Sequence, residues 1–252
     1  MDAMKTALIF GASGGIGQAF TRYCQKNYDS IIVCSRDIEH LQICDKKFAA
    51  NAICYEVDPT KEEQLAQLSE QLSQGNYKLS LIVNACGLLH QEGGPFPEKK
   101  IEDFDAEQFK KIIEANTIVT PLIAKHFLPL LEKGAKGLGT TGIFASLSAR
   151  VGSISDNYLG GWYSYRASKA ALNQIIKTLA IESSRRFKHC AILALHPGTT
   201  DTKLSKPFQE NVPKGKLFSP DYSVSKMMKI IKNADLEDNG KFFAWDGQVI
   251  EW

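Results

Sequence analysis

The stretch TALIFGASGGIG, residues 6–17, joins a short apolar run to a glycine-rich turn. Residues 6–10 have the composition of a buried strand, and an amphipathic segment follows the turn. Gly11 permits a tight turn, Gly15 lets the backbone approach a phosphate, and Gly17 lets a helix pack closely on the strand. A strand, this turn and a helix in that order predict a dinucleotide site, with the pyrophosphate at the free N–H groups of the helix.

The rest of the chain repeats the alternation of apolar runs and amphipathic stretches. Further strands are predicted at 30–34, 52–57, 79–85, 142–147, 190–196 and 240–245. Helices are predicted within 16–27, 62–74, 106–133 and 168–187. Continuous apolar strands alternating with helices indicate the α/β class, a doubly wound parallel sheet of about seven strands in a single domain over 1–252. In such a sheet, ligands bind beyond the carboxyl ends of the strands.

Two long segments without a clear period, 88–103 and 203–222, each follow a predicted strand. We expect them to form substrate loops at the ligand-binding edge of the sheet. Ordinary surface loops are the alternative interpretation.

The composition argues against several classes of partner. Thirty basic and 28 acidic side chains give a net charge of +2, a balance typical of neither a nucleic-acid-binding nor a membrane-binding surface. The start of the chain lacks the apolar core of a signal peptide, so we expect a cytoplasmic protein that acts on a small molecule. The six cysteines form no CxxC pair and have no histidine at ligand spacing, which predicts reduced side chains and no metal site.

The second predicted strand runs into VCSRD, residues 33–37. At this point of a dinucleotide site, a carboxylate accepts hydrogen bonds from a ribose 2′-hydroxyl, whereas an arginine pairs with a 2′-phosphate. Arg36 precedes Asp37, which favours NADP(H) over NAD(H). The alternative for Arg36 is a solvated surface charge.

The stretch WYSYRASKAAL, residues 162–172, contains two tyrosines of which one has a cation four residues later. Residues four apart share one face of a helix, so Lys169 lies above Tyr165, whereas Tyr163 has Ala167 in that place. A phenol has a pKa of about 10, and a nearby ammonium stabilises its anion. Tyr165 is therefore a candidate general acid or base, and packed neighbours are the alternative.

Five motifs in this order resemble the short-chain dehydrogenase/reductase family: GASGGIG, NACG, an asparagine at 116, FASLSARVGS and YRASK. SARVGSISDN, GGWYSYRASKAALN and FFAWDGQVIEW are similar to its C-factor and sniffer-type carbonyl reductase branch. The resemblance implies a Rossmann-type fold, a nicotinamide cofactor, hydride transfer, and a homodimer or homotetramer.

The resemblance also implies roles for individual residues. Tyr165 matches the catalytic acid/base, Lys169 the lysine that binds the nicotinamide ribose and lowers the tyrosine pKa, and Asn116 the residue that holds a relay water. Asn84 matches an asparagine that contacts adenosine or supports the central strand, and Asp58 an aspartate near adenine. The full set expected at the cofactor is Gly11, Ser13, Gly14, Gly15, Ile16, Gly17, Arg36, Asp58, Asn84, Gly87, Tyr165, Lys169, Pro197, Gly198, Thr200 and Thr202.

The serine of the family's catalytic set is ambiguous, because SISDNYLGGW lengthens the gap before the tyrosine. Ser148 is preferred because it stands at the end of its strand, whereas Ser146 should lie deeper in the sheet; Ser153 is a remote third candidate. The chain departs from the family at Phe10, where a threonine is usual, in NACG instead of NNAG, and at Gly14, where a basic residue is common in NADP enzymes.

These features together predict an NADP(H)-dependent carbonyl reductase or alcohol dehydrogenase. One alternative is a dinucleotide-binding regulatory or signalling protein with little turnover, since a shared fold does not determine function. Another alternative is an NAD-preferring enzyme. Arg36 is the residue that distinguishes this alternative from the favoured NADP(H)-dependent enzyme.

Overall fold

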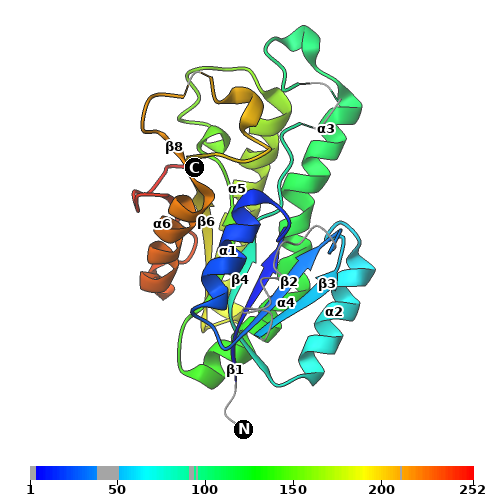
Figure 1. Ribbon diagram of the computed structural model, residues 1–252, viewed down its shortest axis with the longest axis vertical. Helices are drawn as coiled ribbons and strands as arrows, with labels where there is room; N and C mark the ends of the chain where they lie inside the picture. The colour runs from blue at the N-terminus through cyan, green and yellow to red at the C-terminus, as the bar shows by residue number, and fades with distance from the viewer. Residues whose placement is uncertain (1–3, 39–50, 91–93, 95, 211) are drawn as a thin grey trace.

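Seven parallel strands form the central sheet of the computed structural model, which describes residues 4–38, 51–90, 94, 96–210 and 212–252 (Figure 1). The strands are β1 (Met4–Phe10), β2 (Ser30–Ser35), β3 (Ala52–Glu56), β4 (Tyr77–Asn84), β5 (Gly142–Leu147), β6 (Cys190–His196) and β9 (Phe242–Ala244). Their order across the sheet is β3-β2-β1-β4-β5-β6-β9. The predicted doubly wound α/β fold is confirmed.

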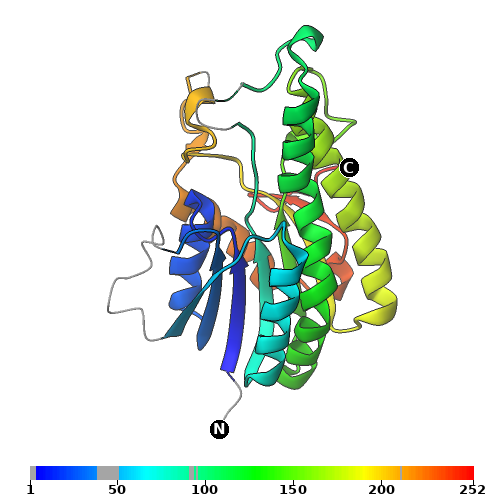
Figure 2. The same ribbon diagram turned by 90° about the vertical axis from the view of Figure 1, so that its right-hand side faces the viewer.

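Helices cover both faces of this sheet, as Figure 2 shows. The helices on one face are α1 (Gly15–Gln25) and α6 (Pro220–Asn233). Those on the other are α2 (Glu62–Gln74), α4 (Val119–Leu138) and α5 (Tyr163–Arg186). Side chains alternate along each strand, so Leu8 and Phe10 pack toward α4 while Ala7 and Ile9 pack toward α1. Because the central strands are buried on both faces, they are largely apolar, whereas the edge strand β3 is partly exposed.

Phe10 shows how the departure from the family is accommodated. Its ring meets that of Phe127, on α4, edge to face with the ring centres 5.4 Å apart. Both side chains are fully buried. The larger residue at position 10 thus joins the core beneath the glycine turn.

The predicted strands agree with the observed ones, but the sequence analysis missed structure in 203–222. A two-stranded sheet joins β7 (Thr199–Thr200) to β8 (Leu217–Phe218), and α6 begins at Pro220. Ser219 caps α6 by accepting a hydrogen bond from the Tyr222 N–H at 3.2 Å. A serine followed by a proline is a helix-start signal that was overlooked.

The long amphipathic segment 106–133 is one nearly continuous helix with a change of pitch. The helix α3 (Ala106–Ile113) passes through a π-helical turn, Glu114–Ile118, into α4. In the part of the chain that the structure describes, no helix has both the length and the apolar character needed to cross a bilayer.

The strand order changes direction between β1 and β4, and the glycine turn lies at this point. A Cβ on Gly11 would lie 2.8 Å from both the Ala85 carbonyl carbon and the Cys86 nitrogen, and Gly11 has a φ of 74°. The turn after β1 therefore crosses the end of β4 in direct backbone contact. Such a switch point is where doubly wound sheets hold their ligands.

Candidate active site

The first turn of α1 offers an open backbone surface. Gly14 is the N-cap of this helix and places no side-chain cap on its N–H groups. A Cβ on Gly15 would lie 2.8 Å from the Thr202 Cγ2 atom, so the loop after β6 approaches the turn closely. Ser13 is exposed, and Ile16 is half-buried in the same turn. The bare N–H groups and the absence of a side chain at Gly15 fit a dinucleotide pyrophosphate.

Two of the predicted cofactor residues follow neighbouring strands on the β1 side of the switch point. Arg36 is exposed directly after β2, and Asp58 follows β3. Burial raises the pKa of the Cys86 thiol to about 12; Arg36 lowers this pKa and Asp58 raises it, so both charges lie within reach of Cys86. The Asp58 carboxylate accepts hydrogen bonds from the Thr60 N–H at 3.0 Å and the Thr60 hydroxyl at 2.8 Å.

Two other predicted cofactor residues direct their side chains into the protein. The Asn84 amide donates to the Thr120 hydroxyl at 2.8 Å and accepts from the Cys86 N–H at 3.1 Å. The Thr200 hydroxyl bonds that of Ser223, on α6, at 2.9 Å. Asn84 thus supports the end of β4, and Thr200 fixes the loop that begins with Pro197 and Gly198, where Gly198 has a φ of 74°.

Helix α5 begins at Tyr163, so both tyrosines lie in its first turn. Tyr163 is 41% exposed, whereas Tyr165 is half-buried and Lys169 is 3% exposed. The Lys169 Nζ atom donates to the Leu147 carbonyl, at the end of β5, over 3.1 Å. It lies 5.7 Å from the centre of the Tyr165 ring, so the predicted pair is brought together.

The pKa shifts of this pair differ from the sequence prediction. Burial raises the pKa of Tyr165 to about 12 and lowers the pKa of Lys169 to about 8. The prediction that Lys169 lowers the Tyr165 pKa is wrong for this arrangement. The ammonium lies near the ring and is bound to the Leu147 carbonyl, so desolvation dominates for both groups.

Asn116 lies in the π-helical turn and ties three segments together. Its amide nitrogen donates to the Leu88 carbonyl at 2.7 Å and to the Ser168 hydroxyl at 2.9 Å. Its amide oxygen accepts from the Leu88 N–H at 2.6 Å. A Cβ on Gly87 would lie 3.6 Å from this oxygen and 3.8 Å from Lys169 Nζ. The Asn116 side chain is therefore fully used in holding the chain after β4 against α5.

The two serine candidates have different surroundings. Ser146 lies within β5, is fully buried, and its hydroxyl lies 3.1 Å from that of Thr120. Ser148 follows the end of β5, and its hydroxyl donates to the Asn173 amide oxygen, on α5, at 2.5 Å. Lys169 bonds the carbonyl of the residue just before Ser148, so Ser148 is the candidate beside the tyrosine and lysine pair.

Buried polar atoms without partners remain next to Ser148. Within the described residues, the Asn173 Nδ2 and His196 Nδ1 atoms have no hydrogen-bond partner. Burial lowers the pKa of His196 to about 4, so this last residue of β6 is neutral near pH 7. In the described part of the chain, no three His, Cys, Asp or Glu side chains gather as metal ligands.

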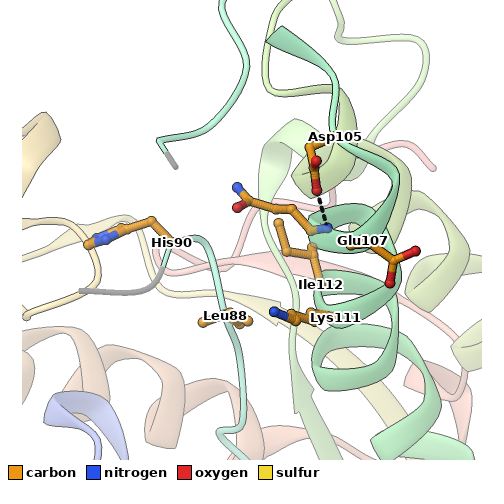
Figure 3. Close-up of a pocket in the computed structure, with 7 residues that line it drawn as sticks. Leu88, His90, Asp105, Glu107, Lys111 and Ile112 are labelled. Carbon is orange, nitrogen blue, oxygen red and sulfur yellow. Dashed lines mark hydrogen bonds between the residues drawn. The ribbon is translucent and has the colours of Figure 1, made fainter. Parts of the chain in front are cut away.

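A cavity of about 100 Å³ lies between α3 and the chain after β4 (Figure 3). The residues that line it are Leu88, His90, Asp105, Glu107, Gln108, Lys111 and Ile112. None of the predicted catalytic residues lines this cavity. It adjoins the site through Leu88, whose backbone holds Asn116, and it shares His90 with the aromatic group near Tyr165, but we do not take it as the place of reaction.

The residues that fasten the chain at Glu98 to the start of α5 were not predicted from the sequence. Glu98 is 2% exposed, and its carboxylate accepts hydrogen bonds from the Ser164 N–H and hydroxyl. Its carbonyl accepts from the Trp162 N–H at 2.5 Å. A carboxylate at a helix N-terminus is stabilising, but the partner helix lies 66 residues away in sequence, beyond the reach of a local capping signal.

Replacing Lys169 by methionine is expected to stabilise the fold at pH 7 by about 2 kcal/mol, because this removes a buried charge that has no acidic partner among the described residues. The pKa of Lys169 is about 8 in the folded protein and about 10.5 in the unfolded chain. Between these two pH values the unfolded chain binds more protons, so the free energy of unfolding of the wild type rises with pH. The advantage of the variant should therefore shrink between pH 7 and pH 9.5 in urea denaturation.

The exposed Lys177, two turns along α5, supplies the matched control. Lys177→Met should give no pH-dependent change in the free energy of unfolding. A Lys169→Met effect that is the same at both pH values would contradict the assignment of a buried, partly deprotonated lysine.

A Rossmann-type sheet with a glycine-rich turn at its switch point and a tyrosine–lysine pair is the arrangement of an oxidoreductase. The chain matches the family described as short chain dehydrogenase over residues 5–213, and it belongs to this family, as its motifs predicted. The 1-hydroxy-2-glutathionyl-2-methyl-3-butene dehydrogenase of Rhodococcus sp. (strain AD45) is 31% identical over 252 residues, covering 99% of this chain and 100% of that protein.

Solved structures show the same fold over nearly the whole chain. NADPH-bound carbonyl reductase from chicken fatty liver is similar with a TM-score of 0.83 and 26% identity, covering 98% of this chain and 99% of that one. Carbonyl reductase Sniffer of D. melanogaster also has a TM-score of 0.83, at 23% identity, covering 99% of this chain and 100% of that one.

Proposed function

We propose that this oxidoreductase interconverts a carbonyl compound and its alcohol with NADP(H), using Tyr165 as the general acid or base. One observation carries the proposal. Tyr165 and Lys169, near the start of α5, meet Ser148 at the carboxyl end of β5, beside the open glycine turn. The similarity to an NADPH-bound carbonyl reductase supports the same cofactor and reaction class.

The cofactor would be held along the switch-point crevice. The N–H groups at Gly15 and Ile16 would bind the pyrophosphate, Arg36 the 2′-phosphate, and Asp58 would lie near the adenine. Gly87 leaves room above Lys169, where the nicotinamide ribose would lie. When bound, the nicotinamide supplies or accepts the hydride.

Ser148 is suited to polarise the substrate carbonyl if its O–H is free to donate. In the present arrangement this O–H donates to the Asn173 oxygen, while the Asn173 Nδ2 atom is buried without a partner among the described residues. If the Asn173 side-chain amide rotates so that its nitrogen and oxygen exchange places, Nδ2 donates a hydrogen bond to the Ser148 hydroxyl oxygen. The serine O–H is then available to the carbonyl oxygen, and the amide hydrogen bond still fixes the serine.

Tyr165 is suited to deliver the proton because its hydroxyl has no hydrogen-bond partner within the described residues and burial keeps it protonated. A protonated phenol is the form required to reduce a carbonyl. Lys169 and the main chain of Asn116, in the π-helical turn, would connect the tyrosine to solvent. Irregular backbone of this kind is frequent at functional sites.

The test is NADPH oxidation by the purified protein over a panel of aldehydes and ketones. We expect turnover of at least one class, with NADH used less efficiently. A protein that binds NADPH but turns over none of the panel would favour the regulatory alternative.

A further inference from the structure

We propose that an aromatic wall built by His90, Phe96, Trp162 and Phe208 next to Tyr165 selects carbonyl substrates that carry an aromatic ring near the reacting carbon. This inference rests on the proposed function and names its substrate class. The wall combines three segments that are distant in sequence: the 88–103 loop, the residue before α5, and the 203–222 loop.

The rings form a connected path that ends on the catalytic tyrosine. Trp162 meets Tyr165 nearly edge to face, with ring centres 6.2 Å apart and an interplanar angle of 77°. Phe208 lies 5.0 Å from Trp162, and His90 lies 5.6 Å from Phe208. Phe96 completes the path at 6.0 Å from His90 and 6.1 Å from Phe208. A substrate at Tyr165 therefore has aromatic surface beside it.

The exposed fractions of these rings indicate that they form a ligand-binding wall and not a small hydrophobic core. Phe96 is 62% exposed, and His90, Trp162, Tyr165 and Phe208 are all half-buried. Neither of the two buried clusters that the described residues form includes any of the five. Rings gathered with their faces partly open to solvent are the surface that an aromatic ligand covers.

The backbone at Trp162 is strained in a way that places its ring. Trp162 has a φ of 54°, the only positive value among the non-glycine residues that the structure describes. Gly160 and Gly161 precede it with φ values of 66° and 64°, and the Glu98 carbonyl accepts from the Trp162 N–H. A bulky residue in this region costs free energy and persists where its surroundings hold it, commonly at functional sites. Here the conformation positions the indole between Tyr165 and Phe208.

A direct contact also fixes the two loops to each other. The His90 Nε2 atom lies 3.2 Å from the Leu204 carbonyl, so this nitrogen carries the hydrogen of the bond. The wall therefore exists before a ligand binds, which lowers the ordering cost of recognition.

The test compares hydrocinnamaldehyde with its counterpart in which the phenyl ring is replaced by cyclohexyl. The two aldehydes have the same chain between ring and carbonyl, so intrinsic reactivity is matched. Aromatic contacts of this kind predict a kcat/KM at least about threefold higher for the phenyl compound. Phe208→Leu, on a surface loop, should at least halve this ratio, and Trp162→Leu should bring it close to one.

Tyr222→Leu is the matched control, because Tyr222 is 40% exposed and belongs to a separate aromatic group with Phe218 and Trp245. This variant should keep the wild-type ratio. Affinities of the two corresponding alcohols, measured by calorimetry with NADP⁺ bound to the Tyr165→Phe variant so that the alcohols are not oxidised, should show the same phenyl preference and the same loss when Phe208→Leu is added.

The outcomes separate this inference from the proposed function. Turnover of both aldehydes with a ratio near one, or a ratio that Phe208→Leu leaves unchanged, would overturn the aromatic wall and leave carbonyl reduction standing. A phenyl preference in alcohol binding without turnover of any carbonyl compound would retain the wall and overturn the reaction. Neither turnover nor alcohol binding would overturn both.

Discussion

Replacing Tyr165 by phenylalanine is expected to lower the rate of NADPH-dependent carbonyl reduction about a thousandfold, the size of effect that a positioned general acid supplies. The substitution removes only the hydroxyl, which has no hydrogen-bond partner within the described residues, so the fold should be kept. The dissociation constant for NADPH, measured by fluorescence titration, should change less than about threefold. Single-turnover rates of NADPH oxidation measure the chemical step directly.

Tyr163→Phe is the control, since it makes the same chemical change two residues earlier. Tyr163 is 41% exposed, and the residue four positions along α5 from it is Ala167, not a lysine. This variant should keep close to the wild-type rate. Retention of more than about a tenth of the rate in Tyr165→Phe would remove the tyrosine from the proton-transfer step.

Removing Arg36 should have the second largest effect, on the choice between cofactors. Arg36→Ala is expected to weaken NADPH binding about 30-fold, corresponding to about 2 kcal/mol for charge-assisted hydrogen bonds to a phosphate. NADH has no 2′-phosphate, so its dissociation constant should change little. The assay is titration of both reduced cofactors at two salt concentrations, since an exposed ion pair weakens as salt rises.

Arg22→Ala controls for a general loss of positive charge. Arg22 is an exposed arginine on α1 that pairs with Asp221 at 2.8 Å, on α6. This variant should alter neither dissociation constant. Equal losses for NADPH and NADH in Arg36→Ala would show that the 2′-phosphate is not what Arg36 recognises.

The sheet could be predicted because each strand is specified locally. Strands such as β1 and β6 are covered on both faces, so nearly every residue in them is apolar and the run is visible without its partners. The small pair β7 and β8 has two residues per strand, too few to show a period. Its pairing depends on a contact across the 203–222 loop.

The candidate site was predictable in its spacing but not in its electrostatics. Helix geometry alone placed Lys169 beside Tyr165. The pKa shifts depend on how much water each group loses, which is decided by the folded chain around them. The role inferred for Trp162 had no local signal either, because its left-handed backbone and its contacts with Glu98 and Phe208 come from distant segments.

The approach to α5 reverses the handedness of the chain. Gly160, Gly161 and Trp162 wind to the left for three residues, and the following 24 residues of α5 wind to the right. The Cβ atom of an L-amino acid clashes with the backbone in a left-handed conformation. Gly160 and Gly161 have no Cβ atom and so avoid this clash. At these two positions a D-amino acid would fit the native backbone better than the L-amino acid with the same side chain. At Gly160, where an added Cβ would meet no atom within 4 Å, chirality rather than side-chain size therefore limits which residues the protein accepts.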